Sequence, residues 1–315
     1  MDLSIYLPVA GTSVPILLLV AIGLLVGGLS GFFGVGAGFL LAPLLIAIGI
    51  PPTVAAGSCA NQVVASSASG ALAHARSRRF DARMALLLLA GALGGGTAGV
   101  HLIRSLASRG HADLAVTLLY ALILGILGYR MFRDSLRSLT TGRLRRDAGG
   151  GVGTLRRTRL ERLIDGLPAV IAFPSAGVRH SILVPLALGA GLGLVTALTG
   201  IGGGFLLVPI LVRRLGIAMP LAVGTVLVTV CLSCVNVTLQ HALVNGTVDV
   251  VLALILFLGG LLGTQIGIRA GRRLRPGQLE IVLAVIVLFV TLKLGADLLL
   301  PPDTPVVVCR TEATR

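Results

Sequence analysis

The chain has 315 residues, of which 55% are hydrophobic and only 12% are charged. Because a soluble protein carries roughly 25% charged residues, this composition excludes a soluble globular protein and favours an integral membrane protein. The net charge of +14 does not indicate nucleic-acid binding, since the arginines lie in short loops between apolar runs, where they mark the cytoplasmic face of a membrane protein.

Apolar runs follow one another along the chain, each about as long as a ~30 Å hydrocarbon core requires. They lie at residues 14–33, 53–75, 84–103, 113–132, 181–199, 219–241, 248–268 and 279–300. These runs predict an all-α polytopic protein that is multi-pass in a bacterial inner membrane. The polar, Arg-rich segment 133–180 separates the fourth run from the fifth, and we expect it to be a cytoplasmic connector.

The two halves of the chain are copies of one unit. GFFGVGAGFLLAPLLIAIGIP at 31–51 aligns with ALTGIGGGFLLVPILVRRLGIA at 197–218, and the match continues as far as Gly96 and Gly263. We therefore predict the following organisation: a first membrane repeat at 1–132, the connector at 133–180, a second membrane repeat at 181–300 and a C-terminal tail at 301–315.

The Gly-rich segment of each repeat is interpreted as a broken or re-entrant hairpin, which leaves three crossing helices per repeat. The second arms, at about 39–49 and 205–215, reach only ~15 Å at 1.5 Å per residue and are too short to cross. This topology makes the two repeats inverted and places nearly all loop arginines on one side of the membrane. A parallel arrangement divides them more evenly, so the inverted arrangement is favoured.

The shared motif G-x-G-[AG]-G-F-x-x-x-P predicts a helix break that binds an anion. Clustered glycines disfavour a continuous helix, and Pro43 and Pro209 each remove a backbone donor from the second arm. That arm then begins with unpaired N–H groups at the positive end of its dipole. The alternative is that the glycines only allow close helix packing. The predicted substrate-binding residues at the breaks are Gly34, Gly36, Gly38, Phe39, Gly200, Gly202, Gly203, Gly204 and Phe205.

The next helix of each repeat carries hydroxyl and amide side chains on one face. Ser58, Gln62, Ser66 and Ser69 match Thr225, Thr229, Ser233 and Asn236 at a constant spacing. From these helices we add Ser58, Asn61, Gln62, Thr225 and Thr229 to the predicted substrate-binding set. The alternative is that the hydroxyls bond to carbonyls of their own helix.

His74 and His241 occupy matching positions near the ends of these helices and are candidate gates or proton acceptors. The alternative is that they are interfacial residues hydrogen-bonded to the backbone. No metal site or cofactor is predicted, because Cys231 and Cys234 have no third or fourth ligand in view.

These residues resemble the sulfite exporter TauE/SafE family, within the toluene-sulfonate uptake permease superfamily. The likeness spans the chain apart from the connector and tail, and its most specific part is the duplicated Gly-rich segment ending in Pro43 and Pro209. The next most specific part runs from His241 to Asp249 and includes Gly246-Thr247-Val248. The resemblance implies transport of sulfur oxyanions or organosulfonates without a bound cofactor, and it does not fix the substrate or the direction.

The predicted function is transport of a small anion, sulfite or an organosulfonate, with the lipid bilayer as the surrounding partner and no enzymatic activity. Export is favoured, because a monoanion leaving a negative interior gains ~2.3 kcal/mol per 100 mV. An anion channel that uses the same glycines remains an alternative, as do a thiol-based enzymatic role for Cys59 or the Cys231/Cys234 pair and a non-transporting scaffold. The sequence does not indicate the oligomeric state.

Overall fold

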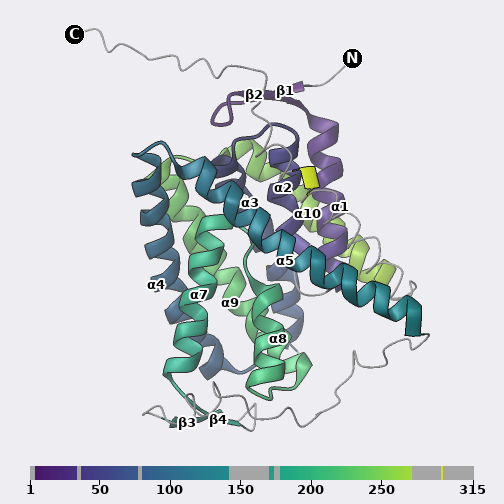
Figure 1. Cartoon of the computed structure of the whole chain (residues 1–315), viewed down its shortest axis with the longest axis vertical. Helices are drawn as coiled ribbons and strands as arrows, with labels where there is room; N and C mark the ends of the chain where they lie inside the picture. Colours follow the sequence, from purple (N-terminus) through teal and green to yellow (C-terminus); the bar gives the residue numbers. More distant parts are fainter. Residues whose placement is uncertain are drawn as a thin grey trace.

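A computed structural model of the chain describes residues 4–33, 37–76, 80–141, 170–173, 178–271 and 292–293 (Figure 1). Within these residues the protein is a bundle of helices with a short β-hairpin at each end. The predicted all-α class therefore holds for the bundle, and the two hairpins are additions to it. The predicted run at 279–300 lies outside the described residues apart from Leu292 and Lys293.

The elements of the first half are β1 (Ser4–Leu7), β2 (Thr12–Pro15), α1 (Ile16–Phe33), the 3-10 helix η1 (Ala37–Leu40), α2 (Leu41–Ala47), α3 (Pro52–Arg76), α4 (Ala82–Ala107) and α5 (Ala112–Thr141). Those of the second half are β3 (Val170–Phe173), β4 (Val178–Ser181), α7 (Leu183–Thr199), α8 (Gly204–Arg214), α9 (Met219–Gln240), the π-helix η2 (His241–Asn245) and α10 (Val250–Gly271). Helix α5 thus continues past the predicted end of its apolar run, into the segment expected to be a connector.

The two β-hairpins extend the duplication further than the sequence comparison did. In β1–β2 Ser4 lies opposite Pro15, and in β3–β4 Val170 lies opposite Ser181, which is the same register. Each hairpin directly precedes the first helix of its half, and Figure 1 shows the two hairpins at opposite ends of the bundle. The pair β3–β4 falls at the end of the range 133–180, with Ser181 just beyond it.

Aspartates start the fourth helix of each half, as helix-capping residues do. Asp81 accepts a hydrogen bond from Met84 N (3.0 Å), and Asp249 accepts one from Leu252 N (3.1 Å). The second carboxylate oxygen of Asp249 also accepts from Val9 N (3.0 Å), which ties the turn of the first hairpin to α10.

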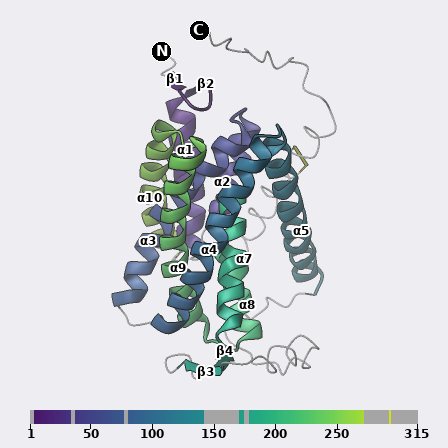
Figure 2. The same ribbon diagram turned by 90° about the vertical axis from the view of Figure 1, so that its left-hand side faces the viewer.

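The first helix of each half packs against the other half. Helix α1 lies along α10 and α7 lies along α4, while α3 and α9 cross between these pairs (Figure 2). Glycines make this contact close: a methyl group at Gly31 would lie 2.2 Å from the Thr264 carbonyl oxygen, and one at Gly193 would lie 2.1 Å from that of Ala92. Small residues at these positions let the helix backbones touch, as they do in many membrane proteins.

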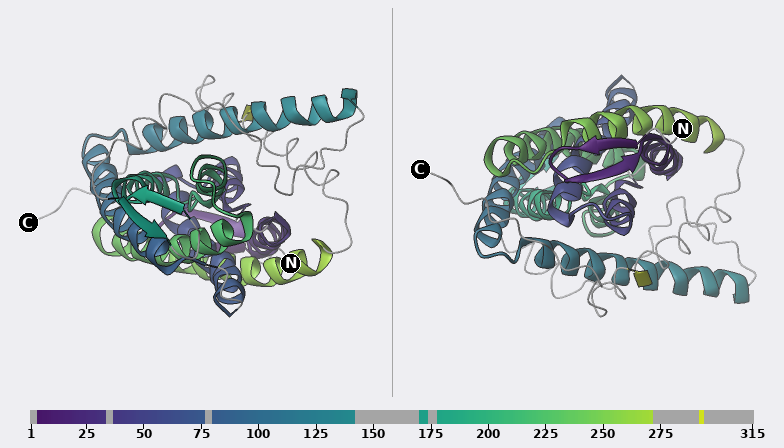
Figure 3. Two further views of the ribbon diagram at one scale, coloured as in Figure 1. Left: turned by 90° about the horizontal axis from the view of Figure 1, so that it is seen from below. Right: turned by 90° about the horizontal axis from the view of Figure 1, so that it is seen from above.

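The described helices include three that are long and apolar enough to cross a membrane, at Ala82–Ala107, Met219–Asn245 and Val250–Ala270. The outer surface of the bundle is apolar as well, since Leu254, Leu258 and Leu262 form an exposed stripe along α10. Helix α5 runs along the opposite side of the bundle from α10 (Figure 3). The fold is therefore that of a helical membrane protein.

Candidate functional site

The chain leaves helical geometry at the Gly-rich segment of the second half. Helix α7 ends at Thr199, and the next residue, Gly200, is left-handed with φ +65°. Gly202 (φ +79°) and Gly203 (φ +55°) are left-handed too, and α8 begins at Gly204. Because a residue with a side chain loses about 1–2 kcal/mol in this conformation, only a run of glycines adopts it easily.

Helix α8 begins with backbone donors that have no acceptor within the helix itself. Its first hydrogen bonds are those from Leu206 N and Leu207 N to Gly203 O, at 3.1 and 3.2 Å. The N–H groups of Gly204 and Phe205 precede this ladder, so they have no acceptor within the helix. They lie at the positive end of the α8 dipole, and Pro209 follows within the same helix.

The corresponding segment of the first half has a different local geometry. Gly34 and Gly36 lie outside the described residues. Gly38 and Phe39 belong to the 3-10 helix η1, and α2 begins only at Leu41, with Pro43 buried inside it. The second arm therefore starts as an α-helix in one half and as a tighter 3-10 turn in the other.

The two Gly-rich segments meet in the interior of the bundle. The rings of Phe39 and Phe205, which are equivalent residues of the two copies, lie 5.1 Å apart at an interplanar angle of 42°. A methyl group at Gly38 would lie 3.6 Å from the carbonyl oxygen of Ile201. The structure therefore brings the second arms of both halves to one place.

Gln62 of α3 lies beside this junction, buried within the bundle. The side chain is 0% exposed, and neither its amide nitrogen nor its amide oxygen has a hydrogen-bond partner among the described residues. A methyl group at Gly38 would lie 3.8 Å from Oε1, and one at Gly260 would lie 2.6 Å from Nε2. A buried polar group without a partner costs about 1–3 kcal/mol, so this amide lacks the satisfaction that a purely structural residue would have.

Two predicted site residues join the halves of the protein. Ser58 Oγ of α3 accepts a hydrogen bond from Asp249 N (3.1 Å), and Thr225 Oγ1 of α9 accepts one from Asp81 N (3.0 Å). These equivalent hydroxyls contact the start of α10 and of α4, so each connects the third helix of one half to the fourth helix of the other.

Other hydroxyls of the predicted polar stripe bond to their own helix. Thr229 Oγ1 donates to Thr225 O (3.0 Å), and Ser66 Oγ donates to Val63 O (3.2 Å). Asn61 is half-buried, and Ser233 is buried with its hydroxyl unpartnered among the described residues. The stripe is therefore mixed, and Gln62 and Ser233 are its buried members with unpartnered polar atoms among the described residues.

The two equivalent histidines have different surroundings. His241 is buried, and its Nε2 donates to the Ala197 carbonyl oxygen (2.9 Å) while its Nδ1 accepts from Asn245 Nδ2 (3.1 Å). His74 is half-buried, with Nδ1 3.2 Å from Gly70 O of its own helix. Both rings thus bond to backbone carbonyls, and a gating role for either residue stays a prediction.

A cavity of about 250 Å³ adjoins the second break. Its wall includes Ile201 and Gly204 from the break, Ser66 and Ser69 from α3, and Thr264 from α10. Ile201, Gly260 and Thr264 were not among the predicted site residues, because the repeated motif does not reveal which helix of the other half packs against it. The glycine spacing of α10, at 259, 263 and 267, is the sequence signal for such a close approach.

The described residues contain no cluster of three His, Cys, Asp or Glu side chains that could hold a metal ion. The site is thus built from backbone groups, hydroxyls and one amide. An apolar helical bundle with a broken helix, and beside the break a small cavity whose largely apolar wall carries a few hydroxyls, defines a polytopic membrane protein.

The chain belongs to the family described as "Sulfite exporter TauE/SafE", which matches residues 19–294. It is 26% identical to the probable membrane transporter protein YjnA of Bacillus subtilis, over 88% of this chain and 98% of that protein. It is also 30% identical to the sulfite exporter TauE/SafE family protein 3 of Arabidopsis thaliana, over 32% of this chain and 21% of that protein. No solved structure matches the chain. The predicted resemblance is confirmed, and the protein is a membrane transporter.

Proposed function

We propose that the protein carries a small anion, sulfite or an organosulfonate, across the bacterial inner membrane, with export as the favoured direction. The anion binds where the two Gly-rich segments meet, next to the α8 N-terminus. The observation that carries this proposal is Gln62, which is fully buried beside that junction and has no hydrogen-bond partner for either amide atom among the described residues. An oxyanion accepts hydrogen bonds, so it satisfies the amide nitrogen and the free N–H groups together.

The chemistry of the cavity wall suits an anion. Hydroxyl side chains line it, and none of the described lining residues is a carboxylate; the hydroxyl residues are Ser30, Ser66, Ser67, Ser69 and Thr264, and His74 lines the cavity as well. Ser66, Ser67, Ser69 and Thr264 donate to backbone carbonyls of their own helices, so each must turn its hydroxyl to donate to an anion. None of the described lining residues is a Lys or Arg, so none of them holds the anion by a fixed positive charge. Pockets for drug-sized ligands span about 300–1,000 Å³, and the smaller volume of this one fits an anion of a few heavy atoms.

We propose further that the two halves are inverted repeats. The support is that β1–β2 and α1 start from one end of the bundle, whereas β3–β4 and α7 start from the other (Figure 1). The positive-inside rule assigns the end where α3 finishes at Arg76 to the cytoplasm, together with the connector 133–180. The cavity beside the second break then faces the cytoplasm, as an exporter waiting for substrate would.

This topology is tested with Cys309, which lies outside the described residues. A membrane-impermeant maleimide is expected to label Cys309 in intact cells, because the tail 301–315 is then outside. Cys59 and Cys234 are buried and provide unlabelled references within the same chain. Labelling that requires cell lysis contradicts the inverted arrangement.

The binding site is tested by flux of radiolabelled sulfite in proteoliposomes that contain the purified protein. Gln62→Leu keeps the size of the side chain and removes its donor, so the flux is expected to fall by about tenfold or more, the loss of a hydrogen bond to a charged ligand. Gln265→Leu is the matched control, because Gln265 is exposed on α10. Equal flux in both variants contradicts the site, and flux that does not saturate with sulfite concentration indicates a channel.

A further inference from the structure

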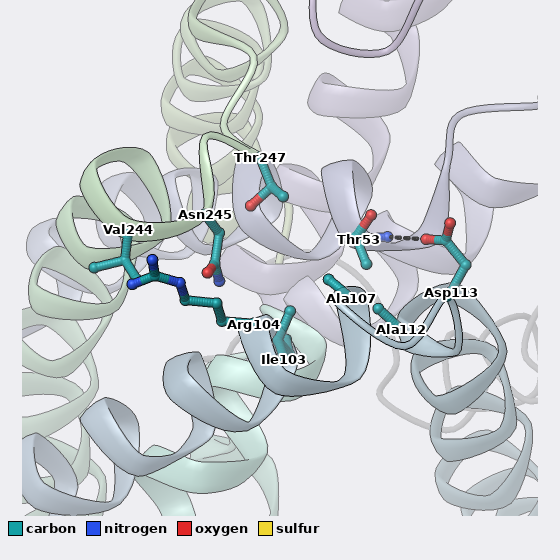
Figure 4. Close-up of a pocket in the computed structure, with 10 residues that line it drawn as sticks. Thr53, Ile103, Arg104, Ala107, Ala112, Asp113, Val244, Asn245 and Thr247 are labelled. Carbon is teal, nitrogen blue, oxygen red and sulfur yellow. Dashed lines mark hydrogen bonds between the residues drawn. The ribbon is translucent and has the colours of Figure 1, made fainter. Parts of the chain in front are cut away.

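A second cavity, of about 270 Å³, lies at the end of the bundle where α4 finishes and α5 begins (Figure 4). Its polar and charged lining residues are Thr53 at the start of α3, Arg104 in the last turn of α4, Asp113 at the start of α5, and Asn245 and Thr247 around the end of η2. No residue lines both this cavity and the one beside the second break. The two cavities are therefore separate.

Arg104 brings a positive charge to this second cavity. Its side chain is exposed, and the described residues offer its guanidinium neither an ion pair nor a hydrogen bond. Figure 4 shows the side chain running away from the end of α4 and toward Val244 and Asn245. It therefore does not serve the last carbonyls of its own helix, which is the usual structural role of an arginine in this position.

The acidic residue of the cavity, Asp113, accepts a backbone hydrogen bond at the start of α3. Asp113 Oδ1 accepts a hydrogen bond from Thr53 N (3.1 Å), so the carboxylate caps the start of α3. Figure 4 places this pair on the far wall from the Arg104 guanidinium. Arg104 and Thr247 thus line the part of the cavity that lies away from this carboxylate, while Asp113 remains part of the same lining.

The wall behind Arg104 is connected to the second break by hydrogen bonds. Asn245 Nδ2 donates to His241 Nδ1 (3.1 Å), and Thr247 Oγ1 lies 3.4 Å from the same nitrogen. On its other side, His241 Nε2 donates to Ala197 O (2.9 Å) in the last turn of α7, just before Gly200. A ligand beside Arg104 is therefore separated from the break by this one bonded layer.

We propose that the Arg104 cavity is a second binding site, which takes a small oxyanion such as a sulfonate. The planar guanidinium matches two oxygens of such an anion with parallel N–H donors, which a single ammonium does not do. The proposal rests on the proposed function in one respect, which is that the anion bound here is the transported one. The cavity would then be the binding site for that anion on the β1–β2 side of the membrane. Binding itself is independent of whether transport occurs.

The test is equilibrium binding of radiolabelled methanesulfonate to the purified full-length chain in nanodiscs. The Gln62→Leu variant is expected to keep the methanesulfonate binding that belongs to the Arg104 cavity, and adding Arg104→Gln is expected to remove it. The double variant is therefore expected to bind methanesulfonate at least about tenfold more weakly than either single variant. Arg109→Gln is the matched control, because Arg109 is an exposed arginine of the α4–α5 turn that does not line the cavity. Ala107→Glu, which adds a negative charge to the cavity wall without changing Arg104, is expected to weaken the same component.

Each outcome decides between the two proposals. Equal effects of Arg104→Gln and Arg109→Gln overturn the second site, because only the overall charge then matters. Binding that depends on Arg104 but not on Gln62, with no sulfite flux in the wild type, retains the second site and rejects the proposed function. With flux present, Arg104→Gln is expected to raise the KM for anion supplied on the β1–β2 side by about tenfold and to leave the KM on the other side unchanged.

Discussion

Gly200 tests the geometry of the second break, and its replacement by alanine is expected to destabilise the protein strongly. Two effects add at this position. The backbone is left-handed (φ +65°), which costs a residue with a side chain about 1–2 kcal/mol. The added methyl group would also lie 2.1 Å from the carbonyl oxygen of Ala56 on α3, and overpacking of this kind costs about 1–3 kcal/mol. The expected loss is therefore about 2–5 kcal/mol.

Two other glycines separate these effects. Gly216 is left-handed as well (φ +69°), but a methyl group there meets no described atom within 4 Å, so only the conformational loss of about 1–2 kcal/mol is expected. Gly191 lies within α7 and also has open space around it. Alanine at Gly191 is expected to raise stability by about 0.5–1 kcal/mol, because a helical glycine loses more chain entropy on folding.

The assay is thermal unfolding in detergent, followed with a thiol-reactive dye. The buried thiols of Cys59 and Cys234 react only when the chain unfolds. Cys231, which is half-buried, and Cys309, which lies outside the described residues, are both replaced by serine. At about 2–4 °C per kcal/mol, Gly200→Ala is expected to lower Tm by roughly 4–20 °C and Gly216→Ala by roughly 2–8 °C. If the Gly200→Ala and Gly216→Ala variants have the same Tm, the contact between the break and α3 is refuted.

Three further predictions use the same unfolding assay. Truncating Phe39 and Phe205 to alanine, singly and together, is expected to give a coupling free energy of about 0.5–1.5 kcal/mol, and additive effects contradict the ring contact. Ser58→Ala and Thr225→Val are each expected to cost about 1–3 kcal/mol, because each leaves an aspartate N–H without its acceptor; a cost in only one of them contradicts their equivalence. Gln62→Leu is expected to raise Tm while it lowers the flux, since it removes a buried amide that has no partner among the described residues, and a lower Tm indicates that the amide has a structural partner.

The helices were largely predictable from hydropathy, because the length of an apolar run is set by the thickness of the bilayer. The run at 84–103 became α4 (Ala82–Ala107), and the run at 248–268 became α10 (Val250–Gly271). Hydropathy also predicted α3 correctly, although its buried polar residues make it the least apolar of these helices. The two β-hairpins could not be predicted from the sequence, because strands of four residues give no clear alternating pattern. The hairpin β3–β4 also lies at the end of a polar segment.

The candidate site was predictable in outline and not in detail. The duplicated motif located Gly38, Phe39 and Phe205, which the structure brings together. The partners of individual hydroxyls could not be predicted, since Ser58 bonds to a residue far along the chain and Thr229 bonds to its own helix. A sequence pattern gives the face on which a side chain lies, whereas the hydrogen bonds depend on which helix the other half supplies.

The packing of the first helix of each half against the other half has a consequence for biogenesis. The glycine-lined face of α1 finds its partner only in α10, and the helices in between must be synthesised first. At about 5–20 residues per second, the ribosome needs roughly 10–50 s to travel from one to the other. During that interval α1 lies in the bilayer without the helix that packs against its glycine-lined face. Correct insertion of the nascent protein therefore depends on keeping α1 in place until α10 is synthesised.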